Sequence, residues 1–249
     1  MGGRFISNKL KKIIMKHNRV KTILALAILS CIMFSCEKDE DEGHPVTIDG
    51  LKYYLYSQSA VIDWGNTSSG VLMIPSEVNY NGKKYIVKGM AAGAFTRSTE
   101  LTKVIIPKTI DEIVHHVLNG MNGAISPDYM NPFVGCTALE SIEVDKDNPF
   151  MCSVDGVLFS KDKTRLYAYP AGAKRESYTI PESVTWIGAN AFSYSQNLST
   201  LIFRGTVTGD IPEDAFEGMN TTTVIYVQQS EIEKVQKVFP GTVLAIDNH

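Results

Sequence analysis

The sequence predicts an α+β or β-rich fold in which short repeats stack into a solenoid. Three observations predict it. Apolar residues recur at fixed offsets from three Ala-Phe pairs, whose aromatic members are Phe95, Phe192 and Phe216. The positions nine and eleven residues after each aromatic are both apolar, as in a short strand with one buried face. Three Ile-Pro pairs, at residues 74–75, 106–107 and 180–181, end such segments, because proline cannot donate to a strand ladder.

The same offsets recur in each aligned repeat. Six residues after the aromatic lie Leu101, Leu198 and Thr222, and five residues before it lie Met90, Ile187 and Ile211. The strand positions are Val104 with Ile106, Leu201 with Phe203, and Ile225 with Val227, while Phe133 repeats the forward half with Leu139, Ile142 and Val144. The period from Phe192 to Phe216 is 24 residues, a length typical of leucine-rich repeats. Single units of this kind must stack to bury their apolar face.

Two insertions interrupt the repeats. Ile113 and Leu118 have the five-residue spacing that opens a repeat, and residues 120–132 intervene before the pattern resumes. Residues 154–170 form the second insertion, which predicts a β-hairpin that turns around residues 161–163.

Both ends of the repeat region contain segments suited to covering an exposed core, as solenoids require. Residues 47–56 and the Asn-Gly pair at 81–82 predict a β-rich amino-terminal cap with a tight turn. Residues 231–239 have apolar positions at helical spacing before Pro240, which predicts a capping helix. We therefore expect one repeat domain with its caps over residues 46–247.

Three stretches carry a family resemblance: IGANAF at residues 187–192, SVDGVLF at 153–159 and YTIPESV at 178–184. With them, residues 46–247 resemble the BspA-like leucine-rich-repeat proteins of bacterial cell surfaces. The resemblance implies a leucine-rich-repeat solenoid with a role in adhesion or host interaction. This chain differs from the family pattern in its small number of repeats, its long insertion and the polar Thr222.

The first 35 residues have the charge and hydropathy of an export signal. They contain seven Lys and Arg residues and no acid, and an apolar run follows the last of these cations over residues 23–34. A run of about twelve residues fits a signal-peptide core and is shorter than the roughly twenty that span a bilayer. A start at Met15 would give a signal peptide of ordinary length, so residues 1–14 are a candidate for a misassigned start.

The apolar run ends at Ser35 and Cys36, which resemble the lipobox of bacterial lipoproteins. Cys31 is the alternative lipidation site, but further apolar residues follow it, whereas the acidic residues 37–42 follow Cys36 and form a solvated tether. An acidic run after the lipidated Cys also resembles the surface-export signal of some anaerobic Gram-negative bacteria, with a plain spacer as the alternative. We predict lipidation at Cys36, a tether over residues 36–45 and a place on the bacterial outer membrane, at the cell surface.

The charge of the exported part disfavours several classes of partner. Without the seven cations of the leader, 17 of the 24 basic residues remain against 27 acidic ones, a net charge of −10. Nucleic acid and anionic membranes attract basic proteins, so we expect neither as a direct partner. We expect a monomer that contacts the membrane only through its lipid and needs no cofactor.

The candidate chemical groups have ordinary structural interpretations. His115 and His116 lack further ligands at a recognisable spacing, and residues 145–148 lack the Gly and the distal Glu of a calcium loop. Cys136 falls at a small core position, which favours a buried free thiol over a disulfide with Cys152, although export permits one. The sequence contains no nucleophile motif and no phosphate loop, so we predict no metal site and no catalytic residue.

Residues between the buried strand positions face outward and form the candidate binding face. In chain order they are Met73, Ile105, Glu143, Thr179, Ile202 and Tyr226. Apolar members of such a column favour contact with a partner, while scattered surface residues, or cover by the insertions, are the alternative. Tyr226 combines apolar area with a hydroxyl and is the strongest single candidate.

Three functions follow, in order of preference. We expect a cell-surface module for binding or adhesion, whose partner is a host or matrix protein or a glycan. A carbohydrate-capture accessory protein is the alternative, and it predicts a stacking platform of exposed aromatics such as Trp64, Tyr129 or Tyr167. An enzyme comes third, because repeats spread side chains over a surface instead of converging them in a pocket.

Overall fold

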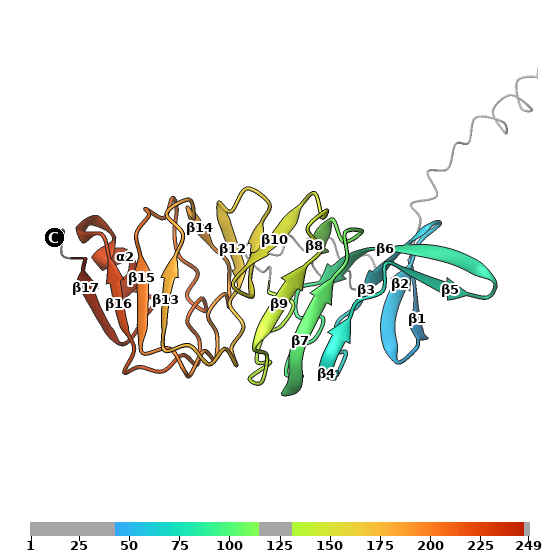
Figure 1. The fold of residues 1–249 in the computed structure, drawn as a ribbon, viewed down its shortest axis with the longest axis horizontal. Helices are drawn as coiled ribbons and strands as arrows, with labels where there is room; N and C mark the ends of the chain where they lie inside the picture. The colour runs from blue at the N-terminus through green and yellow to red at the C-terminus, as the bar shows by residue number, and fades with distance from the viewer. Residues whose placement is uncertain (1–42, 115–130, 247–249) are drawn as a thin grey trace, which may run out of the picture. The chain divides into compact units, whose positions relative to one another are not determined.

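The computed structural model describes residues 43–114 and 131–246, and strands make up nearly all of their regular structure (Figure 1). These residues all belong to one unit that starts at Gly43. The predictions for the leader, for Cys36, and for His115 and His116 fall outside the described residues, as does most of the insertion at 120–132. Among the described helices, none is long and apolar enough to cross a membrane.

The amino-terminal sheet has six strands: β1 (His44–Ile48), β2 (Leu51–Leu55), β3 (Ser59–Ile62), β6 (Lys83–Ala91), β5 (Glu77–Tyr80) and, paired with β6, β8 (Glu112–Val114). β1, β2 and β3 pair antiparallel, and β5 and β6 form a hairpin. In the turn of this hairpin, Asn81 and Gly82 have φ of 51° and 77°. An Asn-Gly pair adopts positive φ at low cost, so the predicted tight turn is confirmed.

Parallel strands from successive repeats lie side by side in two stacks (Figure 1). The first stack is β4 (Ser69–Met73), β7 (Glu100–Ile106) and β9 (Ser141–Val144). The second stack is β13 (Ser177–Ile180), β15 (Thr200–Phe203), β16 (Val224–Val227) and β17 (Thr242–Ala245). β7 and β13 end directly before a proline, as the sequence predicts, and β4 ends one residue earlier, before Ile74.

A further set of parallel pairings, which the sequence does not predict, runs through the same repeats. β3 pairs with β6 and β6 with β8, and β12 (Arg165–Ala168) pairs with β14 (Trp186–Ile187). The Ala-Phe segments themselves lie in turns. From β6 to β9 and from β12 to β15, strands of this further set therefore alternate along the chain with strands of the two stacks.

The insertion at residues 154–170 contains one more turn than the sequence predicts. β10 (Met151–Val154), β11 (Val157–Ser160) and β12 pair antiparallel in succession, and the predicted hairpin turn lies between β11 and β12. Asp155 and Gly156 form the additional turn, with φ of 51° and 78°. An Asp-Gly pair between apolar residues is a recognised signal for this turn, and it is present in the sequence.

Stacked aromatic rings occupy the core of the repeats. Phe95 stacks on Phe133 with ring centroids 5.8 Å apart, and Phe192 stacks on Phe216 at 5.9 Å. Tyr169 occupies the next layer, 5.5 Å from Phe192. Because Phe95, Phe192 and Phe216 are at most 3% exposed, their predicted burial is confirmed.

The prediction for Thr222 is wrong by one residue. Thr222 is exposed, whereas Thr223 is fully buried and its hydroxyl donates to the carbonyl of Leu198 at 2.5 Å. The N–H of Thr223 donates to the carbonyl three residues earlier, as the N–H of Leu101 and that of Leu139 do in their own repeats. Thr223 is thus the equivalent of these leucines, and its hydroxyl is tolerated in the core because it has an acceptor.

The carboxyl end contains a shorter helix than the sequence predicts. A 3-10 turn, η1 (Gln229–Glu231), leads into α2 (Ile232–Gln236), and Val235 and Phe239 pack into the core cluster of the later repeats. The following strand β17 is not predicted from the sequence. Its residues Thr242–Ala245 are a short run that takes its strand conformation from pairing with β16.

Candidate binding surface

The predicted face residues lie in two rows, one in each parallel stack. The N-terminal row is Met73, Ile105 and Glu143, which are register partners across β4, β7 and β9. The C-terminal row is Thr179, Ile202 and Tyr226, which Leu244 of β17 extends. The single column expected from the sequence is therefore two separate rows, and their role in binding stays a prediction.

The turn at Asp155 and Gly156 separates the two rows. The N–H of Ile142 on β9 donates to the carbonyl of Gly156 at 2.9 Å, and the guanidinium of Arg175 donates to the carbonyl of Asp155. A Cβ on Gly156 would lie 2.9 Å from Oγ of Ser141, so only glycine fits this close approach at positive φ. The insertion thus bonds both to the last strand of the first stack and to the segment that precedes the second stack.

Side-chain exposure in the rows is largest on the terminal strands of the stacks. Met73 is 70% exposed, Val71, also on β4, is 59% exposed, and Leu244 on β17 is 44% exposed. The row members on inner strands, Ile105, Ile202 and Tyr226, are half-buried. Their strand neighbours Val104, Ile106, Leu201, Phe203, Ile225 and Val227 are buried, so the predicted alternation of strand faces is confirmed.

Glu143, the charged member of the N-terminal row, has a cationic partner. Nζ of Lys103 lies 2.6 Å from Oε1 of Glu143. Lys103 is the register partner of Val71 on β4 and therefore lies one outward position before Ile105 on β7. The ion pair between Lys103 and Glu143 thus joins successive outward positions of neighbouring strands. An exposed pair of this kind contributes at most about 1 kcal/mol to stability. The row consequently presents Met73 and Ile105 next to a neutralised charge.

The carboxyl-terminal helix α2 packs on the core side of β16. It therefore leaves the outer side, where Tyr226 lies, uncovered. Val235 of α2 belongs to the same buried cluster as Ile225 and Val227. Tyr226 lies between these two in β16, and successive residues of a strand point to opposite faces. The side chain of Tyr226 therefore points away from the face on which Val235 packs.

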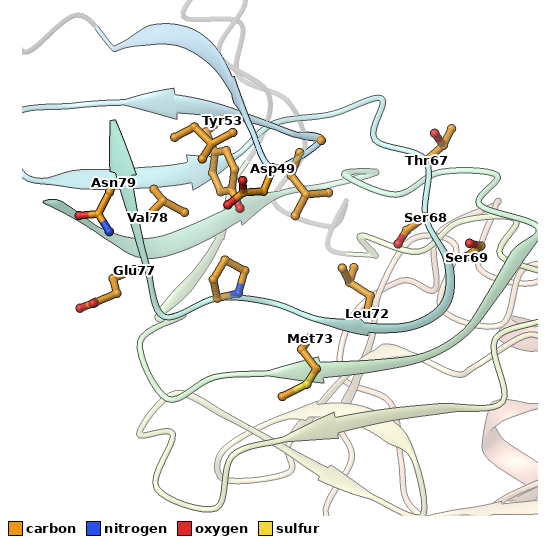
Figure 2. A pocket seen from close by; sticks show the side chains of 14 residues that line it. Asp49, Tyr53, Thr67, Ser68, Ser69, Leu72, Met73, Glu77, Val78 and Asn79 are labelled. Atoms are coloured by element: carbon orange, nitrogen blue, oxygen red, sulfur yellow. The ribbon is translucent and has the colours of Figure 1, made fainter. Parts of the chain in front are cut away.

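A groove of about 670 Å³ lies beside β4 at the end of the first stack. Figure 2 shows its lining, which comes from β4, from the β1–β2 turn at Asp49 and from β5 with Glu77. We call this hollow the β4 groove. Met73 belongs both to the N-terminal row and to the groove. Burial, with a smaller contribution from the charge of Asp49, raises the pKa of Tyr53 in this lining to about 12, so its hydroxyl stays neutral at physiological pH.

The polar loop around Asn148 is a structural turn, as the sequence predicts. Asn148 is fully buried, and its amide nitrogen donates to the carbonyls of Pro107 at 3.1 Å and Ile110 at 2.8 Å. Its amide oxygen accepts the N–H groups of Phe150 and Met151, both at 2.9 Å. Among the residues that the structure describes, no group of three His, Cys, Asp or Glu side chains could hold a metal ion.

Cys136 and Cys152 are free thiols. Cys136 is fully buried with Sγ 3.0 Å from the carbonyl oxygen of Phe95, and burial raises the pKa of its thiol to about 11. Burial also raises the pKa of the half-buried Cys152 thiol, against the opposing charges of Lys163 and Lys161. A nucleophilic thiol needs a lowered pKa, so both cysteines have the wrong shift for that role.

The aromatic residues of the carbohydrate alternative lie in different surroundings. Trp64 is 53% exposed, and Tyr129 is outside the described residues. Tyr167 is half-buried and lies edge-on to Trp186 with ring centroids 6.2 Å apart, while the guanidinium of Arg165 is 5.4 Å from the Trp186 ring. The sequence does not predict this aromatic cluster, because the pairing of β12 with β14 brings it together.

Parallel strands repeated in register over a core of recurrent apolar residues define a β-rich leucine-rich-repeat protein. Residues 163–241 match the family model of the BspA type leucine rich repeat region in six copies. Residues 163–241 therefore carry BspA-type leucine-rich repeats, as the resemblance predicts. The parallel pairings of β4, β7 and β9 place the same kind of strand stack before the matched region.

Solved structures of bacterial leucine-rich repeat proteins are similar to the chain at low sequence identity. A leucine-rich repeat protein from Eubacterium ventriosum is 18% identical, with 82% of this chain and 68% of that chain covered and a TM-score of 0.42. A leucine rich cell surface protein from Faecalibacterium prausnitzii is 14% identical, with coverages of 84% and 96% and a TM-score of 0.28. A leucine-rich repeat protein from Bacteroides ovatus is 20% identical, with 73% of this chain and 55% of that chain covered and a TM-score of 0.35. A comparison with curated proteins found no match.

Proposed function

We propose that this chain is an exported surface lipoprotein whose repeat solenoid binds a protein or glycan partner without catalysing a reaction. The observation that carries the proposal is the C-terminal row, where four register-aligned strands project Thr179, Ile202, Tyr226 and Leu244 in line. A row of this kind makes many shallow contacts with a large partner, and the binding energy concentrates in its larger side chains. The match to BspA-type repeats supports the same class of function.

Non-catalytic binding also agrees with the places of the titratable groups. The groups whose pKa burial raises most, namely Tyr178, Tyr169, Tyr53 and Cys136, belong to the hydrophobic clusters. Their shifts hold them neutral, which suits packing and does not poise a nucleophile or a base near neutral pH. The caps and the repeat scaffold then have one purpose, which is to keep the rows in register.

The place at the cell surface is proposed from the leader and Cys36. One structurally similar protein, from Faecalibacterium prausnitzii, is itself described as a cell surface protein, which agrees with this place. The test is Cys36→Ala in cells fed a labelled lipid precursor, with Cys31→Ala as the matched control. We expect label and membrane association to disappear only in Cys36→Ala. Loss only in Cys31→Ala would move the lipidation site, and label that persists in Cys36→Ala would refute Cys36 as the required site.

Binding by the C-terminal row is tested with the full chain, purified in detergent, on arrays of glycans and extracellular-matrix proteins. We expect Tyr226→Ala and Ile202→Ala each to weaken a bound spot by about tenfold or more while leaving the melting temperature nearly unchanged. Phe150→Ala is the control, because Phe150 is 52% exposed and lies outside both rows. Normal binding by both row variants, together with loss of binding when residues 120–132 are replaced, would place the function in the insertion.

Carbohydrate capture is the second candidate, favoured by the cluster of Tyr167, Trp186 and Arg165. Aromatic rings with an adjacent cation suit a sugar ring that offers C–H groups on one face and hydroxyls at its rim. This candidate predicts that Tyr167→Ala and Trp186→Ala abolish glycan spots on the same array. Tyr226→Ala would leave those spots unchanged.

A further inference from the structure

β4 is an edge strand with an unusual composition. Within the described residues it pairs with β7 on one side only, and it ends the order β4-β7-β9. Proteins usually protect such edges with charged side chains or proline inside the strand, because unpaired N–H and C=O groups template the addition of another strand. β4 reads Ser-Gly-Val-Leu-Met, carries no charge, and exposes Val71 and Met73 to 59% and 70%.

The backbone groups of Met73 point to the open side of β4. The N–H of Ile74 donates to the carbonyl of Ile105 on β7 at 3.0 Å, so the backbone of Ile74 faces β7. Backbone groups of successive residues in a strand point to opposite edges, and therefore the N–H and C=O of Met73 face away from β7. The register runs without a shift from Val71 to Met73, so Val71 faces the same open edge.

The β4 groove lies along this strand. Its far wall is the β1–β2 turn, and Ser69, Leu72 and Met73 of β4 line the groove, as Figure 2 shows. The volume of about 670 Å³ is within the range of about 300–1,000 Å³ that is usual for ligand sites in proteins. An extended chain inserted here can bond to the edge of β4 and place alternate side chains in the groove.

The charge of the lining points to the chemistry of the inserted chain. Two carboxylates, Asp49 and Glu77, line the groove, and none of the described lining residues is Lys or Arg. Lys84 lies 2.8 Å from Glu77 in an exposed ion pair and neutralises that carboxylate, so Asp49 supplies the negative charge that the lining offers to a ligand. Asp49 lines the groove at the β1–β2 turn, near Tyr53, whose pKa is raised by burial and to a smaller extent by the charge of Asp49. A cationic side chain complements this lining, and an acidic one does not.

We propose that the β4 groove binds an extended polypeptide segment, with a Lys or Arg side chain directed at Asp49, as an added strand on the edge of β4. This inference rests on the proposed binding function and names a partner class and a second place on the scaffold, distinct from the C-terminal row. Main-chain bonds to Met73 and Val71 supply affinity, and the groove supplies preference for one positively charged position.

The probe is a phage library of random eight-residue peptides, selected on the full chain in detergent. We expect enriched peptides to combine one Lys or Arg with β-branched or apolar neighbours. A synthetic copy of the most enriched peptide should bind Met73→Pro at least about tenfold more weakly, because proline removes the outward N–H. Met73→Ala is the matched control, since it removes the same side chain and keeps the N–H. Asp49→Asn should weaken binding most at low salt, and asparagine suits the turn because φ of Asp49 is 48°.

Proline at position 73 keeps the bonds to β7, because the N–H it removes faces away from that strand. If Met73→Pro nevertheless unfolds, the wild-type chain is titrated with peptides N-methylated at alternate positions. Added-strand binding requires that methylation at one set of alternate positions abolishes binding and that methylation at the other set leaves it intact.

Several outcomes overturn the proposal. They are the absence of enrichment, enrichment of acidic peptides, and equal peptide binding by folded Met73→Pro and the wild type. A concentration-dependent dimer that Met73→Pro dissolves, with no bound peptide, would assign the edge to self-association instead. If partners found on the glycan and matrix-protein array still require Tyr226, the proposed function stands whichever of these outcomes occurs. The two proposals can therefore be refuted independently.

Discussion

Replacing Phe192 by alanine tests the core of the repeats most directly. The ring is fully buried, and its centroid lies 5.5 Å from Tyr169, 5.9 Å from Phe216 and 6.5 Å from Phe203. A Phe-to-Ala change in a core costs about 3–5 kcal/mol, from lost transfer energy and from the cavity that remains. We expect a loss of about 4–5 kcal/mol, because aromatic neighbours in the preceding and following layers both lose a packing surface.

Guanidinium unfolding, followed by tryptophan fluorescence and by far-UV circular dichroism, measures this loss. A domain of about 200 residues loses about 2–4 °C in melting temperature per kcal/mol, so thermal unfolding should show a decrease of roughly 8–20 °C. The control is Phe150→Ala, which removes the same ring from a side chain that is 52% exposed and should change stability by about 0.5 kcal/mol or less. A change this small for Phe192→Ala would mean that the phase of the repeats is wrong.

The remaining predictions concern two buried polar groups. Asn148→Ala should destabilise the chain by about 3 kcal/mol in the same unfolding assay, because buried carbonyl and N–H groups lose four hydrogen bonds. Asp147→Ala, at an exposed neighbour in the same turn, is its control, and equal effects of the two changes would contradict the role of the amide. For Cys136, burial raises the pKa of the thiol to about 11 in the folded chain, against an ordinary value of 9.0. Between these values the unfolded thiol ionises and the folded one stays protonated, so stability should fall as pH rises from 9 to 11 and be unaffected by this group below pH 9. Unfolding measured from pH 8 to 10 should show a smaller decrease in Cys136→Ala than in the wild type, and parallel curves would contradict the assignment. Above pH 10 the buried tyrosines, whose pKa values burial also raises, add to the decrease in both chains.

Much of the core was predictable because repeats place equivalent residues at equal spacing. Phe95, Phe192 and Phe216 are all buried, and Phe133 starts a further unit of the same phase. The Asn81-Gly82 turn was predictable for a local reason, since these residues adopt positive φ at low cost. Thr222 shows the limit of a fixed offset. The buried position falls one residue later, at Thr223, and its burial and its hydrogen bonds in the structure identify it.

The repeat phase and the buried side of each strand could be predicted from the sequence, because both depend on spacings of a few residues along the chain. The same spacings predict which residues face outward, among them Met73, Ile105 and Tyr226. The division of these residues into two rows is visible only in the structure, because the Asp155–Gly156 turn bonds to β9 where a further parallel strand would otherwise pair. The open edge of β4 and the groove beside it are also visible only in the structure, because a strand has an open edge when no other strand pairs with that side of it. Neighbours in space that are far apart in sequence leave no periodic signal, and for that reason these features needed the fold.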